Sequence, residues 1–172
     1  MTALSLCFAM CQPALGADDM DFFELSPEQL LNIEVTSVSK KAQSLNEAAA
    51  AVYVITGEDI LQSGVQTVPE ALRMAPGVQV AQSDSNSWAV SIRGFNGILA
   101  NKLLVMIDGR TVYNPLFAGT YWELQDLVLE NIDRIEVVRG PGGAIWGANA
   151  VNGVINIITK NAKDTQGRLI TG

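Results

Sequence analysis

Short apolar runs separated by Gly, Pro, Asn and Asp constrain the fold of this chain more than any other sequence feature. Runs of this kind that are rich in Val and Ile are typical of β-strands. One of them is followed by Asp108-Gly109, which predicts a tight hairpin turn. The expected strands are residues 52–55, 78–81, 89–93, 103–107, 132–138 and 154–159. The 172 residues suffice for one ordinary core, so we expect a single α+β domain with a small mixed β-sheet and short helices.

Helix signals occupy some of the spaces between these strands. Thr67 is followed three residues later by Glu70, which is the pattern of a capping box at the start of a helix. Thr56 predicts the start of another helix, which Gly64 ends. Ser26, followed by a proline, predicts a brief helix nearer the N-terminus. The helices are therefore expected to be short connectors.

Residues 1–16 carry no charge, contain an apolar run and lead into small residues, which predicts a signal peptide. The alternative is a short buried helix, because the run is too short to span a membrane. Both cysteines, Cys7 and Cys11, lie in this segment, so the mature chain has no thiol and its compartment is the periplasm or beyond. We expect a periplasmic tail over residues 17–48, in which residues 33–39 alternate at the strand period, and the folded domain over residues 49–160.

The charge pattern excludes several function classes. The formal net charge is -7 without a basic stripe, which argues against nucleic-acid binding, and the chain contains no histidine, the commonest general base and metal ligand. In the glycine-rich run 139–149, Gly142 and Gly147 have the outer spacing of a phosphate-binding loop. Ala148 and Asn149, however, stand where Lys and Ser or Thr are needed. We therefore expect no catalytic site, no cofactor and no metal site.

Two arginines stand out because each follows an apolar strand and precedes a glycine. Arg93 and Arg139 are expected to be partly buried, and a buried guanidinium needs carboxylate or carbonyl partners. Glu136 precedes Arg139 on the same expected strand and is expected to project from the same face. From the residues alone, an ion pair that only stabilises the sheet remains an equal alternative to a functional role.

Seven motifs in order resemble the plug domain of TonB-dependent outer-membrane receptors, over about residues 33–160. They are AVYVIT at 51–56, PEALR at 69–73, PGV at 76–78, SIRGF at 91–95, LVMIDG at 104–109, IDRIEVVRGP at 132–141 and GANAVNGVINII at 147–158. The resemblance implies a plug normally enclosed in a transmembrane β-barrel that is absent here, with residues 161–172 as the start of the lost barrel region. It also implies that the periplasmic protein TonB pulls on the plug to admit a substrate.

The resemblance assigns roles to three sets of residues. A TonB box, bound by the TonB C-terminal domain as an added strand, is expected at Glu34, Val35, Thr36, Ser37 and Val38. A lock between plug and barrel is expected at Arg93, Glu136 and Arg139, with the arginines facing barrel glutamates. Loops that face the substrate are expected at Ser85, Asn86, Ser87, Trp88, Tyr113, Asn114, Tyr121 and Trp122, although turn formation and interface packing explain these residues equally well.

The expected function is the plug of a receptor in the bacterial outer membrane, facing the periplasm, for active uptake of a scarce nutrient. The substrate would be a metal chelate such as an iron-siderophore, or cobalamin, and the chain a fragment or truncated form. The alternative is a free-standing periplasmic module that binds TonB without transport. Without the barrel, we expect exposure of whichever of Trp88, Trp122 and Trp146 normally faces the wall.

Overall fold

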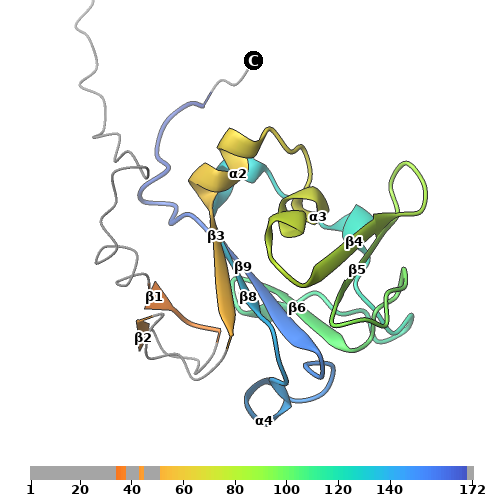
Figure 1. The fold of residues 1–172 in the computed structure, drawn as a ribbon. Helices are drawn as coiled ribbons and strands as arrows, with labels where there is room; N and C mark the ends of the chain where they lie inside the picture. The colour runs from red at the N-terminus through yellow and green to blue at the C-terminus, as the bar shows by residue number, and fades with distance from the viewer. Residues whose placement is uncertain (1–33, 38–42, 45–50, 170–172) are drawn as a thin grey trace, which may run out of the picture.

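A five-stranded mixed sheet forms the centre of the molecule in the computed structural model, which describes residues 34–37, 43–44 and 51–169 (Figure 1). Strands β6 and β9 pair in parallel and the other neighbours are antiparallel. The strands, in their order across the sheet, are β3 (Val52–Thr56), β8 (Ile132–Val138), β9 (Gly153–Thr159), β6 (Leu103–Ile107) and β7 (Arg110–Thr111). The predicted α+β class with a mixed sheet is confirmed, and β6 and β8 occupy the predicted residues.

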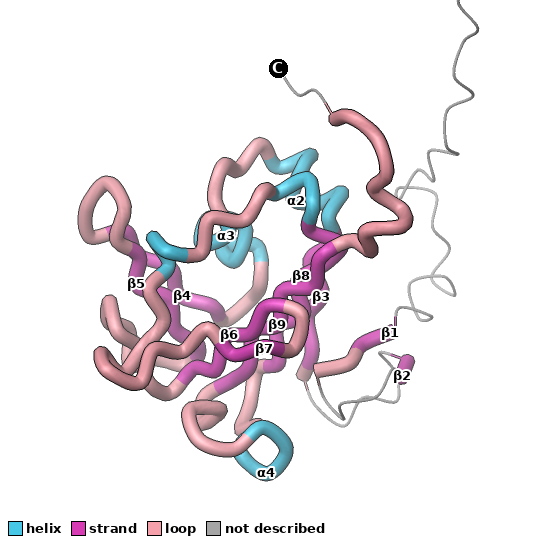
Figure 2. Tube along the Cα trace, turned by 180° about the vertical axis from the view of Figure 1, so that it is seen from behind, coloured by secondary structure: helices cyan, strands magenta, loops and turns pink. Residues whose placement is uncertain are grey.

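Among the residues that the structure describes, two further pairs of strands lie outside this sheet. The hairpin of β4 (Val78–Gln82) and β5 (Trp88–Ile92) packs over the sheet on the same side as α2 (Gly57–Ser63) and α3 (Val68–Ala71) (Figures 1 and 2). The very short β1 (Glu34–Val35) and β2 (Gln43–Ser44) pair beyond β3. The alternating pattern at residues 33–39 thus yields a two-residue strand within the described residues.

The helices are short, as predicted. Helix α2 (Gly57–Ser63) begins with a reciprocal capping box in which the Thr56 hydroxyl accepts from the Asp59 amide at 3.1 Å. It ends at Gly64, whose φ of 69° is the left-handed conformation that glycine adopts without strain. Helix α3 (Val68–Ala71) has the predicted Thr67 and Glu70 capping box and continues into η3 (Leu72–Met74). The other short helices are η4 (Trp122–Leu124), η5 (Leu129–Asn131) and α4 (Gly143–Trp146).

The hairpin between β6 and β7 has the predicted two-residue turn. Asp108 and Gly109 have φ of 49° and 75°, and Ile107 pairs with Arg110 across the turn. Both residues thus adopt the left-handed conformation that such a turn requires, which explains why Asp-Gly occurs here.

Side chains on the two faces of the sheet belong to two separate hydrophobic clusters. The larger cluster joins Ile135, Val137 and Ile155 to α2, α3, η4 and the β4–β5 hairpin. The smaller cluster, on the opposite face, contains Leu104 and Val154 and is partly covered by Trp146. This division follows from the strand period of two, because neighbouring residues of one strand point to opposite faces.

Two of the three tryptophans are buried in the core. Trp88 and Trp122 have only 6% and 5% of their surface accessible and belong to the larger cluster, while Trp146 is half-buried. The hairpin, η4 and α3 bury both indoles within this domain, so of the three tryptophans only Trp146 remains a candidate for the surface that faces a wall.

The predicted signal peptide, the helix signal at Ser26 and Val38 lie outside the described residues. Near the other end, Arg168 and Leu169 belong to no strand, and residues 170–172 lie outside the described residues. Among the described residues, no helix is both long and apolar enough to cross a membrane.

Candidate functional site

The predicted TonB-box segment is docked on the sheet through one carboxylate. Glu136 Oε2 accepts hydrogen bonds from the backbone amides of Thr36 at 3.0 Å and Ser37 at 2.8 Å. The Ser37 hydroxyl donates to the same oxygen at 2.5 Å. Val35 and Ser37 are 0% and 1% exposed, so residues 35–37 cover part of the sheet face that carries Glu136.

Glu136 is a charged residue in the middle of the sheet, between Val54 of β3 and Asn156 of β9 in the register. Its side chain is fully buried, and the Arg134 guanidinium, 23% exposed, donates to its other oxygen at 3.0 Å. Arg134 also pairs with the more exposed Asp133. A buried carboxylate needs such compensation, and here it comes from one cation and the N-terminal segment.

Trp146 completes the contact from the other side of the segment. Its indole nitrogen donates to the carbonyl oxygen of Ser37 at 2.7 Å. The indole is presented by α4, a single turn in the glycine-rich run that sequence analysis treated only as a failed nucleotide loop. Helix α4 is four residues long. The turn that follows it contains Gly147 and Asn149, both with positive φ.

The structure does not bring Glu136 and Arg139 together. The expectation of a shared face was wrong because Arg139, which directly follows β8, stands three positions after Glu136, and an odd offset places the two side chains on opposite faces of the sheet. Arg139 points instead toward the helix side, where one terminal nitrogen donates to the Pro76 carbonyl at 3.3 Å. The Nε of Arg139 is buried and has no hydrogen-bond partner among the described residues.

Arg93 is exposed, contrary to the expected partial burial, and hydrogen bonds to none of the residues that the structure describes. It starts three consecutive residues with positive φ, followed by Gly94 and Phe95 at 91° and 59°. Two non-glycine residues in this conformation are strained by about 1–2 kcal/mol each. Such strain is concentrated at functional positions, which keeps Arg93 a candidate.

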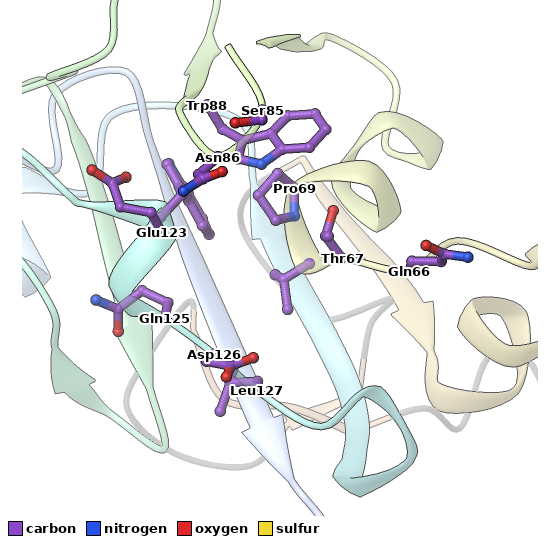
Figure 3. A pocket seen from close by; sticks show the side chains of 12 residues that line it. Gln66, Thr67, Pro69, Ser85, Asn86, Trp88, Glu123, Gln125, Asp126 and Leu127 are labelled. Carbon is purple, nitrogen blue, oxygen red and sulfur yellow. The ribbon is translucent and has the colours of Figure 1, made fainter. Parts of the chain in front are cut away.

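The predicted substrate-loop residues divide between two places. Ser85, Asn86, Trp88 and Trp122 line one pocket of about 290 Å³, between the tip of the β4–β5 hairpin, the start of α3 and residues 122–127 (Figure 3). Tyr113 and Asn114 line a separate hollow beside β7. Ser87 is half-buried, and its backbone amide donates to the Asp84 carboxylate within the turn of the β4–β5 hairpin.

Burial limits what the aromatic members of this set can do. Trp88 lies under the guanidinium of Arg73, 5.6 Å from the ring centroid, and packs in the core together with Trp122. With 6% and 5% of their surfaces accessible, the two rings offer little area for stacking on a chelate. Tyr121 is half-buried and packs edge-on against Phe117, with ring centroids 5.4 Å apart.

Sequence analysis missed a group of exposed apolar side chains on two neighbouring loops. Gly119 approaches Leu99 so closely that an added Cβ would lie 2.8 Å from the Leu99 Cα, so the loops touch. Lys102 places its ammonium 3.7 Å from the centre of the Phe95 ring. The exposed members are Phe95, Ile98, Leu99, Leu116 and Phe117, with 69%, 49%, 40%, 81% and 50% of their surfaces accessible. In the sequence, these residues could have been recognised as apolar side chains that lie within turn-rich segments rather than in expected strands.

No group of three or more potential metal ligands occurs within the described ranges. The residues of the candidate site offer backbone groups, one buried carboxylate, two arginines and exposed apolar loops.

Comparison with known proteins identifies relatives along most of the chain. The chain is 32% identical over 139 residues to the vitamin B12 transporter BtuB of Vibrio vulnificus, covering 80% of this chain and 22% of that protein. It is 36% identical over 137 residues to the iron-regulated outer membrane virulence protein of Vibrio cholerae, covering 77% and 20%. The solved alcaligin outer membrane receptor FauA of Bordetella pertussis superposes with a TM-score of 0.57 at 25% identity, covering 74% and 21%.

The chain thus spans about a fifth of the length of the relatives that it matches. Residues 44–154 match the family described as TonB-dependent Receptor Plug Domain, and this range contains all of the described sheet from β3 to the start of β9. The match covers well over half of the chain, and the fold agrees with the solved relative: this chain belongs to the TonB-dependent receptor plug family.

Proposed function

We propose that this chain is the plug part of a TonB-dependent outer-membrane receptor that takes up a scarce nutrient, such as an iron-siderophore or cobalamin. The family match over residues 44–154 carries this proposal. Relatives named as a vitamin B12 transporter and as an alcaligin receptor support this range of substrates without choosing within it. No feature of the described residues supports an enzyme, and plugs of this family belong to transporters and receptors.

The chain spans about a fifth of the length of its relatives. In this proposal, the remaining sequence of the receptor forms the surrounding barrel. Arg139 supports contact with a second part of the receptor, because its Nε is buried and has no hydrogen-bond acceptor within the described ranges. A carboxylate on a barrel wall would satisfy it with a charge-assisted hydrogen bond. Arg93, exposed and strained, is the second candidate for such a contact.

The exposed apolar loops also suit a plug. Side chains such as Leu116 and Phe95 leave most of their surface in water, and apolar patches of this kind mark binding surfaces. In the full receptor they would contact the barrel interior or the nutrient. In this proposal the plug works at the outer membrane and presents residues 34–38 to TonB on the periplasmic side.

Calorimetric titration of the purified 172-residue chain tests the proposal. We expect the TonB C-terminal domain to bind, and we expect no tight binding of ferric siderophore or cobalamin, because half of each nutrient site would belong to the barrel. Absence of TonB binding would overturn the proposal. Tight binding of a nutrient by this chain alone would favour the free-standing module instead.

A further inference from the structure

We propose that the pocket between the tip of the β4–β5 hairpin, the start of α3 and residues 122–127 binds an uncharged, hydroxyl-rich group such as a sugar ring (Figure 3). The role of that group as part of a nutrient rests on the proposed function. Binding itself is a property of this pocket and can be measured on the chain without TonB, so the two proposals can fail separately.

The pocket combines a buried apolar part with a polar rim. Val68, Trp88 and Trp122 form the buried part and are only 3%, 6% and 5% exposed. The rim consists of exposed side chains that carry amides, a hydroxyl and two carboxylates: Gln66, Ser85, Asn86, Glu123 and Asp126. Small-molecule sites commonly have this composition and volumes of about 300–1,000 Å³. The volume here, about 290 Å³, therefore suits a single ring rather than a whole chelate.

Trp88 offers the pocket a hydrogen-bond donor without a partner. In Figure 3 its indole nitrogen lies on the edge of the ring that faces the pocket, and it donates to none of the residues that the structure describes. A buried tryptophan N–H usually has an acceptor, because an unpaired buried donor costs free energy. The ring itself is nearly inaccessible and lies under Arg73, so the N–H is what Trp88 can offer. A ligand in this pocket must therefore carry an acceptor.

Glu123 and Asp126 require the opposite from the ligand. Neither carboxylate forms a hydrogen bond or an ion pair with another residue in the described ranges. Ionised carboxylates only accept hydrogen bonds, so the ligand must also carry donors. Among the described residues, none that lines the pocket is a lysine or an arginine. Both carboxylates would therefore repel an anionic ligand, and no cation of the pocket offsets this repulsion.

Hydroxyl groups meet both requirements. One hydroxyl can donate to Glu123 or Asp126 and another can accept from Trp88, because each hydroxyl both donates and accepts. An ammonium group only donates and would leave the Trp88 N–H unpaired. A carboxylate or phosphate only accepts and would meet two like charges. In the proposed receptor, the pocket therefore favours a nutrient that presents an uncharged, hydroxyl-rich part to the plug over one that presents only anionic groups.

Titration of the ¹⁵N-labelled 172-residue chain, followed by NMR of its indole N–H groups, tests the proposal. The probes are glucose, galactose, mannose and ribose, with gluconate as the anionic and putrescine as the cationic comparison. We expect at least one sugar to shift the Trp88 N–H signal saturably, with a dissociation constant on the order of 1 mM. Gluconate and putrescine should bind at least about tenfold more weakly than that sugar. The Trp146 N–H, which donates to the Ser37 carbonyl outside the pocket, should not shift.

Four variants place the bound sugar. Glu123→Gln and Asp126→Asn change exposed side chains, so the fold is retained while a charged acceptor is lost. Trp88→Phe keeps an aromatic ring, removes the donor and assigns the indole signal. We expect each of these three variants to bind the sugar about three- to tenfold more weakly, the size of one hydrogen bond. Asp164→Asn, at an exposed carboxylate that does not line the pocket, is the matched control and should bind as the wild type does.

Each contrary result overturns a defined part of the proposal. If none of the four sugars shifts the Trp88 signal saturably, the pocket is not a sugar site. Gluconate or putrescine binding as tightly as the best sugar would overturn the uncharged class of ligand. Equal affinities of Glu123→Gln, Asp126→Asn and Asp164→Asn would overturn the role of the two carboxylates. None of these outcomes affects TonB binding, and a chain that fails to bind TonB would overturn the proposed function while leaving the sugar titration valid.

Discussion

Replacing Arg134 with methionine tests whether Glu136 is charged and compensated in the core. Arg134 Nε lies 3.0 Å from Glu136 Oε1, and Glu136 is completely buried. Removing one partner of a fully buried pair costs about 3–5 kcal/mol, whereas an exposed pair contributes about 0–1 kcal/mol. Arg134 is 23% exposed and Glu136 keeps the bonds from Thr36 and Ser37, so we expect an intermediate loss of about 2 kcal/mol.

Urea unfolding followed by tryptophan fluorescence measures this loss, because Trp88 and Trp122 are buried and report the larger core. The same loss should lower the melting temperature by roughly 4–8 °C in a chain of this size. Arg110→Met, at an exposed arginine of β7, is the control and should change stability by less than about 0.5 kcal/mol.

Repeating Arg134→Met in a Glu136→Gln protein shows whether the buried charge of Glu136 causes the loss of stability. With a neutral side chain at this position no charge is buried, so Arg134→Met should cost less than about 1 kcal/mol there. An equal loss in both backgrounds would mean that the arginine stem matters only through packing. No loss in the wild-type background would refute the reasoning about the buried carboxylate.

Three further predictions concern other parts of the chain. Gly153→Ala should destabilise the domain by about 1–3 kcal/mol, because the new Cβ would lie 2.6 Å from the Val138 carbonyl oxygen. Gly143→Ala is the control, since its new Cβ would lie 3.9 Å from the nearest non-neighbouring atom, the Ala150 carbonyl oxygen. Equal urea midpoints for the two variants would contradict the close packing of β9. Hydrogen bonds from the amides of Asn86 and Ser87 lower the pKa of Asp84 and hold the tip of the β4–β5 hairpin in place. These bonds should be present above the ordinary aspartate pKa and be lost as the pH falls through the lowered pKa. Amide NMR should show the loss, and the same pH profile in Asp84→Asn would rule out this cause. In a receptor that carries its barrel, Arg93→Ala with Arg139→Ala should loosen the plug by about 3–5 kcal/mol for each broken buried pair, seen as protease cleavage of the plug, and unchanged protection would remove the lock role.

The local elements of this fold were predictable because their causes are local. Capping at Thr56 and Thr67, the left-handed Gly64 and the Asp108-Gly109 turn each depend on residues within a few positions of one another. β6 is a fully buried apolar run and β8 is buried except at Asp133 and Arg134, so their Val and Ile content marked their bounds.

The site was less predictable because its contacts are long-range. Nothing near Thr36 or Ser37 in the sequence indicates that Glu136 holds them, since the partners lie 99 and 100 positions away. The supposed pairing of Glu136 with Arg139 ignored the odd spacing between them, and strict alternation along β8 would have excluded it. The burial of Trp88 and Trp122 depends on how the hairpin, α3 and η4 fold over the sheet, which no local pattern specifies.

The TonB affinity of paired proline and alanine variants tests the central claim most directly. In strand addition every second residue of the added segment donates an amide to its partner, so proline at one of two neighbouring positions must remove a bond. We predict that Val35→Pro or Thr36→Pro weakens binding of the TonB C-terminal domain at least about tenfold, while Val35→Ala and Thr36→Ala bind as tightly as the wild type or more tightly. Equal affinities for the proline and alanine variants at both positions would contradict the account.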